Sequence, residues 1–247
     1  MGIGTMREVC LIPARIGSTR FPRKPLALIS GVPMIIRVAE RASEVFGKEG
    51  TYVVTDSSEI EDLALSSGFS AVRVDEDVPT GTDRIARTVS LIQGVGRFYN
   101  LQGDEPLVSP ADLQAFRLAS SQLGAEVTNG FIAKSGDARK SSPNAIKLAI
   151  NADSGLMYAS RSPIPFGASA SNLQVCMYSF TPEALAWFAA TERGPLERAE
   201  NIEIMRFIEN GRSVKMLETF SASHAVDVPA DIAVVESILA LQSNPNG

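Results

Sequence analysis

The sequence has little cysteine and no long apolar run. Its two cysteines, Cys10 and Cys176, lie far apart in apolar surroundings, so nothing indicates a disulfide or an oxidising compartment. The longest apolar run, residues 184–190, is far shorter than the roughly twenty residues that cross a bilayer. Residues 1–8 lack the apolar core of a signal peptide. We therefore expect a cytoplasmic protein with no membrane partner.

The chain also lacks an excess of positive charge. Its 23 basic and 28 acidic residues give a net charge of −5, which argues against a nucleic-acid partner. Its single histidine, His224, lies near Asp227 and is given no role, since a lone histidine is more often structural. With 247 residues and 45% hydrophobic content, the chain can form one large domain or a main domain with a smaller lobe.

Positive charge is concentrated in one loop. The apolar run Val9 to Ile12 predicts a buried first strand, and residues 13–24 follow it with three arginines, a lysine and two prolines that prevent a helix. Backbone N–H groups at Ala14, Gly17 and Ser18 can meet phosphate, and Arg15 and Lys24 are the cations expected to bind it. The alternative is a solvated basic loop without a ligand.

Strand and helix signals then alternate along the chain. We expect a helix over 33–46, a strand over 51–55, a helix through Ser67 and a strand over 70–74. Such alternation predicts an α/β fold with a mostly parallel, Rossmann-like sheet covered by helices on both faces. Ligands of such sheets bind beyond the carboxyl ends of the strands, where the basic loop lies.

Two further segments are candidates for that site. Residues 79–84 begin a helix expected to run through Ile92; helix caps are the favoured interpretation, and the alternative is that Gly81 lets a nucleobase or ribose approach the backbone. The strand near residue 100 ends in Gln102-Gly103-Asp104-Glu105-Pro106. Carboxylates there suit a divalent metal held against phosphate oxygens, although an acidic turn without chemistry is the alternative.

The rest of the chain predicts a smaller lobe and a return to the core. Residues 110–123 predict a helix, 137–142 a polar loop, and 145–180 a mixed or antiparallel lobe. Helices are expected from Thr181 and over 197–210, then a strand over 214–217 and a last helix after Asp231. The predicted organisation is a nucleotide-binding core (7–144), a sugar-binding and dimerisation lobe (145–180) and a return to the core (181–243).

Five motifs, taken in order, resemble the 3-deoxy-manno-octulosonate cytidylyltransferases, or CMP-Kdo synthetases. They are Pro13-Ala14-Arg15 with Ser18, Arg20 and Lys24; Gly81-Thr82-Asp83-Arg84; Asn100 to Pro106; Pro143-Asn144-Ala145-Ile146-Lys147; and Val226-Asp227-Val228-Pro229. The resemblance implies that a 3-deoxy-2-ulosonic acid attacks the α-phosphate of CTP, giving a CMP-sugar and pyrophosphate. It also implies Mg²⁺, a homodimer and a nucleotidyltransferase fold.

The resemblance further implies a role for each matching residue. Arg15 and Lys24 would neutralise the β and γ phosphates, and Asp104 and Asp227 would hold Mg²⁺ on the α-phosphate. Residues 80–84 would face the cytidine, and Arg161 the sugar carboxylate. The implied catalytic residues are Arg15, Lys24 and Asp104, and the implied substrate contacts are Ala14, Ser18, Thr80, Gly81, Thr82, Arg84, Gln102, Arg161, Gln174, Tyr178, Glu200 and Glu203.

Two positions depart from the family pattern. Gln174 stands where the family has a sugar-contacting histidine, and Ile204 stands where it has an amide. Loss of a hydrogen-bonding partner would disfavour the original sugar, so the expected acceptor is Kdo or a relative with altered hydroxyls or side chain. The alternatives are a nucleotidyltransferase of the same fold that uses another nucleotide or a sugar phosphate, and a catalytically silent CTP-binding protein.

Overall fold

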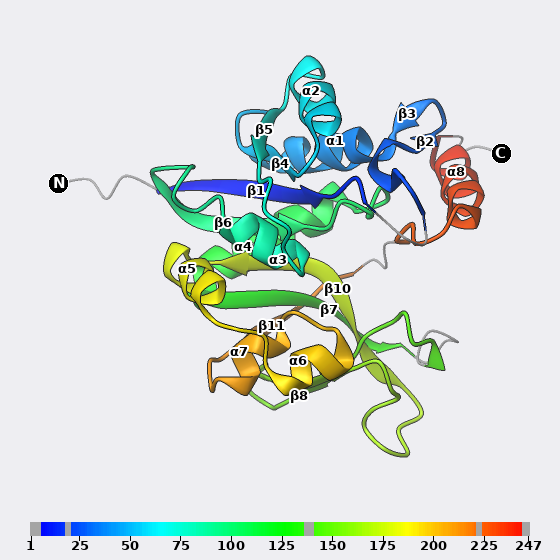
Figure 1. Ribbon diagram of the computed structural model, residues 1–247. Helices are drawn as coiled ribbons and strands as arrows, with labels where there is room; N and C mark the ends of the chain where they lie inside the picture. Colours follow the sequence, from blue (N-terminus) through cyan, green and yellow to red (C-terminus); the bar gives the residue numbers. More distant parts are fainter. Residues whose placement is uncertain (1–5, 18–20, 136–140, 221–223, 244–247) are drawn as a thin grey trace.

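The structure is a computed structural model that describes residues 6–17, 21–135, 141–220 and 224–243, with helices on both sides of a twisted sheet (Figure 1). The strands are β1 Arg7–Ala14, β2 Leu28–Ile29, β3 Val32–Pro33, β4 Thr51–Thr55, β5 Ser70–Arg73, β6 Val95–Leu101, β7 Val127–Ser135, β8 Lys147–Ile150, β9 Leu156–Ser160, β10 Ser171–Phe180 and β11 Lys215–Glu218. The helices are η1 Lys24–Leu26, α1 Met34–Phe46, α2 Ser58–Ser66, α3 Gly81–Ala86, α4 Pro110–Leu123, α5 Pro182–Ala190, α6 Pro195–Glu200, α7 Met205–Glu209 and α8 Ala230–Ser243.

The central sheet has the strand order β11-β7-β10-β6-β1-β4-β5. Strand β1 pairs in parallel with both β4 and β6, and β11 pairs in parallel with β7. Of the described strands in this path, only β10 runs antiparallel to its neighbours β6 and β7. The expected mostly parallel sheet is confirmed, and β1 lies in its interior between β6 and β4.

Apolar side chains cover both faces of this sheet. On one face Cys10 and Ile12 of β1 pack with side chains of α1, α2 and α4. On the other face Val9 and Leu11 pack with side chains of α3, α5 and α7. Because alternate residues of a strand point to opposite faces, the run that predicted a buried first strand supplies both cores.

The last helix packs in a separate, small apolar cluster. Helix α8 packs beside β2, where Ile29, Met34, Val226 and Val235 form a small apolar cluster (Figure 1). This packing places the segment just before α8 next to the loop that follows β1. Within the described ranges, no helix has the length and apolar character that a membrane span requires.

Two predicted helices have different bounds. Helix α3 ends at Ala86, not near Ile92, because the following N–H groups bond three residues back and the Thr88 hydroxyl donates to the Ile85 carbonyl. The single helix expected over 197–210 is wrong. It is broken between α6 and α7, where Asn201 adopts the left-handed conformation at φ 53°.

Strand β7 lies in a segment for which no element is predicted above, and it contains Asn129-Gly130, a pair that is common in turns. In the structure the Asn129 side-chain amide donates to the carbonyls of Val175 and Met177, both at 2.9 Å, where β10 is irregular. Residues 145–180 supply β8, β9 and β10. Strands β8 and β9 form an antiparallel pair at the start of β10, whose last residues belong to the central sheet.

Candidate active site

A cavity of about 260 Å³ opens at the carboxyl ends of β1 and β6. Five separate segments form its walls: the loop after β1, the start of α1, the start of α3, the turn after β6 and the segment before α8. Its lining residues are Pro13, Ala14, Arg15, Lys24, Pro25, Met34, Val78, Pro79, Thr80, Gly81, Arg84, Gln102, Gly103, Asp104 and Asp227.

One wall of this cavity combines a cation with two acids. Lys24 Nζ lies 2.7 Å from Asp104 Oδ2 and donates to the Val226 carbonyl at 2.8 Å. The Val226 N–H in turn donates to the Asp104 carbonyl at 2.9 Å, so the segment that carries Asp227 is tied to the end of β6. Arg15 is exposed and lines the same cavity. The structure therefore brings Arg15, Lys24, Asp104 and Asp227 together.

Gly103 and Gly81 allow the chain segments around the cavity to approach closely. A Cβ at Gly103 would lie 2.7 Å from the Pro13 carbonyl oxygen, which is closer than real Cβ atoms come. A Cβ at Gly81 would lie 3.3 Å from both Gln102 Oε1 and Pro13 Cγ. Since β1 and β6 meet here without side chains between them, Asp104 is held beside the loop after β1.

The first turn of α3 is capped by Thr80, as the favoured interpretation of residues 79–84 predicted. Thr80 Oγ1 accepts a hydrogen bond from the Asp83 N–H at 3.0 Å and donates to Asp83 Oδ2 at 2.7 Å. Thr80 and Gly81 also line the cavity, so the cap and the cavity wall are the same residues. The open N-terminus of α3 contributes partial positive charge at this wall.

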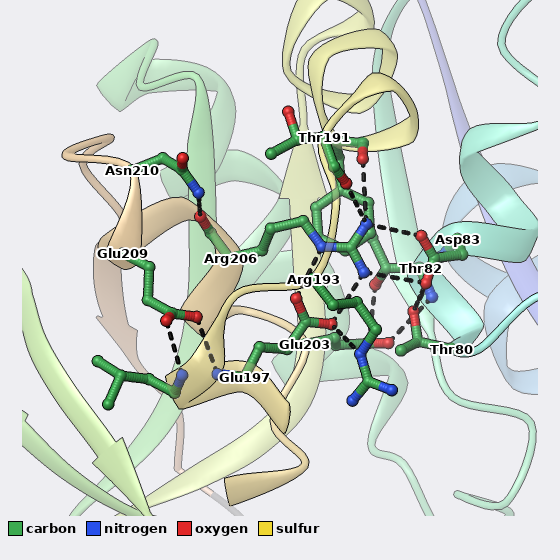
Figure 2. A network of polar contacts seen from close by, with 12 residues as sticks. Thr80, Thr82, Asp83, Thr191, Arg193, Glu197, Glu203, Arg206, Glu209 and Asn210 are labelled. Atoms are coloured by element: carbon green, nitrogen blue, oxygen red, sulfur yellow. Dashed lines mark hydrogen bonds and ion pairs between the residues drawn. The ribbon is translucent and has the colours of Figure 1, made fainter. Parts of the chain in front are cut away.

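Glu203, which lies between α6 and α7, contacts the first turn of α3 (Figure 2). Its carboxylate accepts from Thr82 Oγ1 at 2.7 Å, from the Thr82 N–H at 3.1 Å and from Gln102 Nε2 at 3.3 Å. Burial raises the pKa of Glu203, and the hydrogen bonds from Thr82 oppose that rise. The structure thus joins α3, the end of β6 and the α6–α7 turn at one carboxylate.

A second cavity of about 220 Å³ adjoins the first through four shared residues, Pro79, Thr80, Gly81 and Gln102. Glu203, Gln174 and Tyr178 also line it. Burial raises the pKa of Tyr178, so its hydroxyl stays protonated at neutral pH. A third cavity, about 330 Å³, shares Gln174 with the second and Asp227 with the first. The three cavities therefore adjoin one another through shared lining residues.

Arg84 is placed by a residue that the sequence did not single out for the site. It is 3% exposed, and its guanidinium donates to the Val74 carbonyl at 2.7 Å and to Asp56 Oδ2 at 3.1 Å. Asp56 Oδ1 accepts from the Ile16 N–H at 3.0 Å, which ties the loop after β1 to α3. Asp56 stands just before α2, where an aspartate is typical of a helix cap, so no local signal indicated its contact with Arg84.

Arg161 and Glu200 contact each other outside the three cavities. The Arg161 guanidinium donates to the carbonyls of Glu200, Pro143 and Asn201 at 2.8 to 3.3 Å. Glu200 accepts from Tyr158, Ser160 and the Arg161 N–H, and these bonds lower its pKa although its burial acts to raise it. In the described chain neither residue lines the three cavities.

The two positions that depart from the family pattern lie in different surroundings. Ile204 is 1% exposed and packs in the core beneath α7, so the departure from the family pattern there alters packing and not a cavity wall. Gln174 does line the second and third cavities, and its Nε2 donates to Asn129 Oδ1 at 2.8 Å. Ser18 and Arg20 fall outside the described residues.

Comparison with known proteins identifies this arrangement. A family model described as cytidylyltransferase matches residues 9–220. The chain belongs to the cytidylyltransferase family. It is 34% identical over 235 residues to a 3-deoxy-manno-octulosonate cytidylyltransferase of Wolinella succinogenes, an alignment that covers 90% of this chain and 95% of that protein.

Within the family, two further relatives carry the resemblance. An 8-amino-3,8-dideoxy-manno-octulosonate cytidylyltransferase of Shewanella frigidimarina is 37% identical over 254 residues, covering 96% of this chain and all of that protein. A solved structure of CMP:2-keto-3-deoxy-manno-octonic acid synthetase complexed with CTP is 30% identical, with a TM-score of 0.88 over 96% of this chain and 99% of that chain. The family and the fold expected from the motifs are therefore confirmed.

The acids of this cytidylyltransferase suit a magnesium ion that is shared with a phosphate. Asp104 and Asp227 line the same cavity and offer carboxylate oxygens, the donors that Mg²⁺ prefers. The described residues contain no group of three or more acidic, histidine or cysteine side chains arranged to hold a metal alone. Mg²⁺ is commonly bound by one or two carboxylates together with substrate phosphates, so the donor set fits that mode.

Proposed function

We propose that this cytidylyltransferase transfers CMP from CTP to a 3-deoxy-2-ulosonic acid, Kdo or a close relative, and releases pyrophosphate. The observation that carries the proposal is the single cavity that Arg15, Lys24, Asp104 and Asp227 line together. Cations and carboxylates meet there at the carboxyl ends of parallel strands, which is where nucleotides bind to such sheets. The names of the relatives support the choice of CTP and of a Kdo-like acceptor.

In the proposed reaction the anomeric hydroxyl oxygen of the acceptor attacks the α-phosphorus. A new P–O bond forms, the bond from the α-phosphorus to the oxygen that bridges it to the β-phosphorus breaks, pyrophosphate leaves, and the hydroxyl proton passes to water. Arg15 and Lys24 would bind the β and γ phosphates and neutralise the charge that grows on the leaving group. Thr80, Gly81 and Arg84 would bind the cytidine, and Gln102 would lie between nucleotide and acceptor because it lines both cavities.

The acceptor would occupy the second and third cavities. Gln102, Gln174, Tyr178 and Glu203 line the second cavity and supply the amide, phenol and carboxylate groups that bind sugar hydroxyls. A role for Arg161 toward the sugar carboxylate stays a proposal. Its guanidinium already donates to three main-chain carbonyls, so binding a carboxylate would replace at least one of these contacts.

We further propose that Asp104 and Asp227 hold Mg²⁺ against the α-phosphate. When bound, the ion would withdraw charge from the phosphate and lower the pKa of the attacking hydroxyl. Lys24 would hold the Asp104 carboxylate in position through its 2.7 Å contact. Chelation with EDTA is expected to stop pyrophosphate release, and added Mg²⁺ to restore it. Full turnover in EDTA would refute the metal proposal.

The reaction is tested by measuring pyrophosphate release with CTP and a panel of acids. The panel holds Kdo, its 8-amino derivative and a sialic-type acid, and the expected result is turnover with at least one of them. No release with any of these acids would refute the reaction. Thermal shifts with CTP, UTP, GTP and dTTP identify the nucleotide, since a bound ligand raises the Tm by mass action. Saturable CTP binding without release would indicate the catalytically silent alternative.

Three expectations from the sequence accompany this proposal. They are a homodimer formed through residues 145–180, a cytoplasmic location, and the division into a core (7–144), a lobe (145–180) and a return to the core (181–243). The oligomeric state is measured by light scattering during gel filtration at micromolar protein. A monomer with full activity would remove the dimer from the functional unit.

A further inference from the structure

Arg206 is a buried arginine that the proposed reaction does not use. It is 2% exposed and lies on α7, at the centre of the polar network in Figure 2. Its guanidinium contacts Asp83 through Nη1 at 2.7 Å and Nη2 at 3.1 Å, and contacts Glu197 through Nε at 2.7 Å and Nη2 at 2.8 Å. Nη1 also donates to the carbonyls of Phe188 and Thr191, both at 3.1 Å. Every donor group of this guanidinium therefore has an acceptor.

Arg206 is also held by an aromatic ring and by a neighbouring ion pair. Its guanidinium carbon lies 3.7 Å from the centre of the Phe188 ring, so one face stacks on an aromatic side chain. Arg193 Nε contacts Glu197 Oε1 at 3.0 Å, so the cluster holds two arginines against two carboxylates. Each charged side chain of this buried cluster therefore has a partner of opposite charge, as buried charges require.

Two neighbouring residues of α3 are held from the α6–α7 segment. Arg206 holds Asp83, and Glu203, three residues earlier, holds Thr82 through its side chain and its N–H. The two residues just before them, Thr80 and Gly81, line both the first and the second cavity. A shift of this turn would therefore change the shape of both cavities at their shared wall.

We propose that Arg206 is a positioning residue for nucleotide binding, which it serves without touching substrate. Arg206 contacts Asp83 through two nitrogens and Glu197 through two nitrogens. These contacts set the position of the first turn of α3 relative to Gln102 and the end of β6. The inference rests on the proposed function, because it concerns how the CTP site is held in shape. The planar guanidinium of arginine is essential here, since a lysine ammonium cannot form two parallel hydrogen bonds to each of two carboxylates.

The test compares two identical substitutions on one part of the fold. Arg206→Lys keeps the charge and removes the paired contacts. Arg212→Lys is the matched control: Arg212 lies 2.6 Å from Glu126 Oε2 and stacks over the Trp187 ring at 4.7 Å, so it packs on α5 instead of α3. Both variants and the wild type are assayed for pyrophosphate release against CTP concentration, well below each protein's own Tm.

For Arg206→Lys we expect the KM for CTP to rise roughly tenfold while kcat falls much less, because binding is lost in ground and transition state alike. For Arg212→Lys we expect wild-type kinetics. A KM for CTP in Arg206→Lys within about threefold of wild type would overturn the proposal, since a purely structural role lowers only the Tm.

A second variant decides the matter if Arg206→Lys does not fold. Asp83→Asn keeps the size of the side chain and the hydrogen bond from the residue 83 N–H to Thr80 Oγ1, and it removes the negative charge that Arg206 contacts. The same rise in the KM for CTP is expected, and an unchanged KM overturns the proposal. A wild type that releases no pyrophosphate and shows no thermal shift with CTP would instead refute the proposed function, so the two failures are distinct.

Discussion

Replacing Gly103 by alanine tests whether the close approach of β1 and β6 sets the catalytic geometry. An alanine Cβ would lie 2.7 Å from the Pro13 carbonyl oxygen, about 0.7 Å short of the 3.4 Å at which ordinary contact begins. The opposing atom belongs to the backbone, so it cannot turn aside as a flexible side chain would. The ends of the two strands must therefore separate.

The size of the effect follows from what lies beside Gly103. Asp104 is the next residue, and its 2.7 Å contact with Lys24 connects it to the loop after β1. A misplacement of about 1 Å at a reacting group costs on the order of 100-fold in rate, so we expect kcat to fall about 10- to 100-fold. Overpacking costs about 1–3 kcal/mol, which corresponds to a Tm lower by roughly 2–12 °C for a chain of this size.

The assay is pyrophosphate release with saturating CTP and acceptor, together with a thermal melt. Gly130→Ala is the matched control, because Gly130 is also a buried glycine and its Cβ would meet Thr219 Cγ2 at an ordinary 3.4 Å. We expect near wild-type turnover from Gly130→Ala. If Gly103→Ala kept full turnover as well, the close approach would not control the position of Asp104, and the reasoning would be refuted.

Three further changes probe the site. Asp104→Asn keeps the size of the side chain and should lower kcat by on the order of 10³-fold with little change in Tm; a wild-type kcat would mean that the metal site is misplaced. Lys24→Met should lower kcat/KM for CTP about 100-fold in the same assay, and an unchanged value would remove Lys24 from phosphate binding. The raised pKa of Glu203 means that its contribution to stability is present at low pH and lost as pH rises through that pKa, above its ordinary 4.5. The Tm of Glu203→Gln minus that of wild type should therefore increase from pH 4.5 to 8 in thermal melts, and a flat difference would contradict the raised pKa.

Local signals predicted much of the fold. Helix α4 begins where Ser109 accepts from the Asp112 N–H and Pro110 occupies the first turn, and α5 begins in the same way after Thr181. The buried run in β1 and the alternation that follows it indicated the parallel sheet. These features depend on residues close in sequence, so reading along the chain was sufficient to find them.

Where packing overrides a local signal, prediction from sequence failed. The Asn129-Gly130 pair looks like a turn, and only the irregularity of β10 supplies acceptors for the Asn129 amide inside a strand. The break between α6 and α7 depends on Asn201 in the left-handed conformation, and it presents Glu203 to Thr82. The residues that Asn129 and Glu203 contact are far from them in sequence. A short stretch of sequence therefore cannot predict either contact.

The sequence by itself indicated the residue types of the candidate site: a basic loop after the first strand and a carboxylate at Asp104, with Asp227 implied by the family resemblance. Only the tertiary structure decided that Lys24 meets Asp104 across 80 residues, and that Arg206 meets Asp83 across 123. It also placed Arg161, Glu200 and Ile204 away from the cavities. The physical reason is that strand order and the packing of α3, α6 and α7 set these distances, and both arise from contacts between segments far apart in the chain.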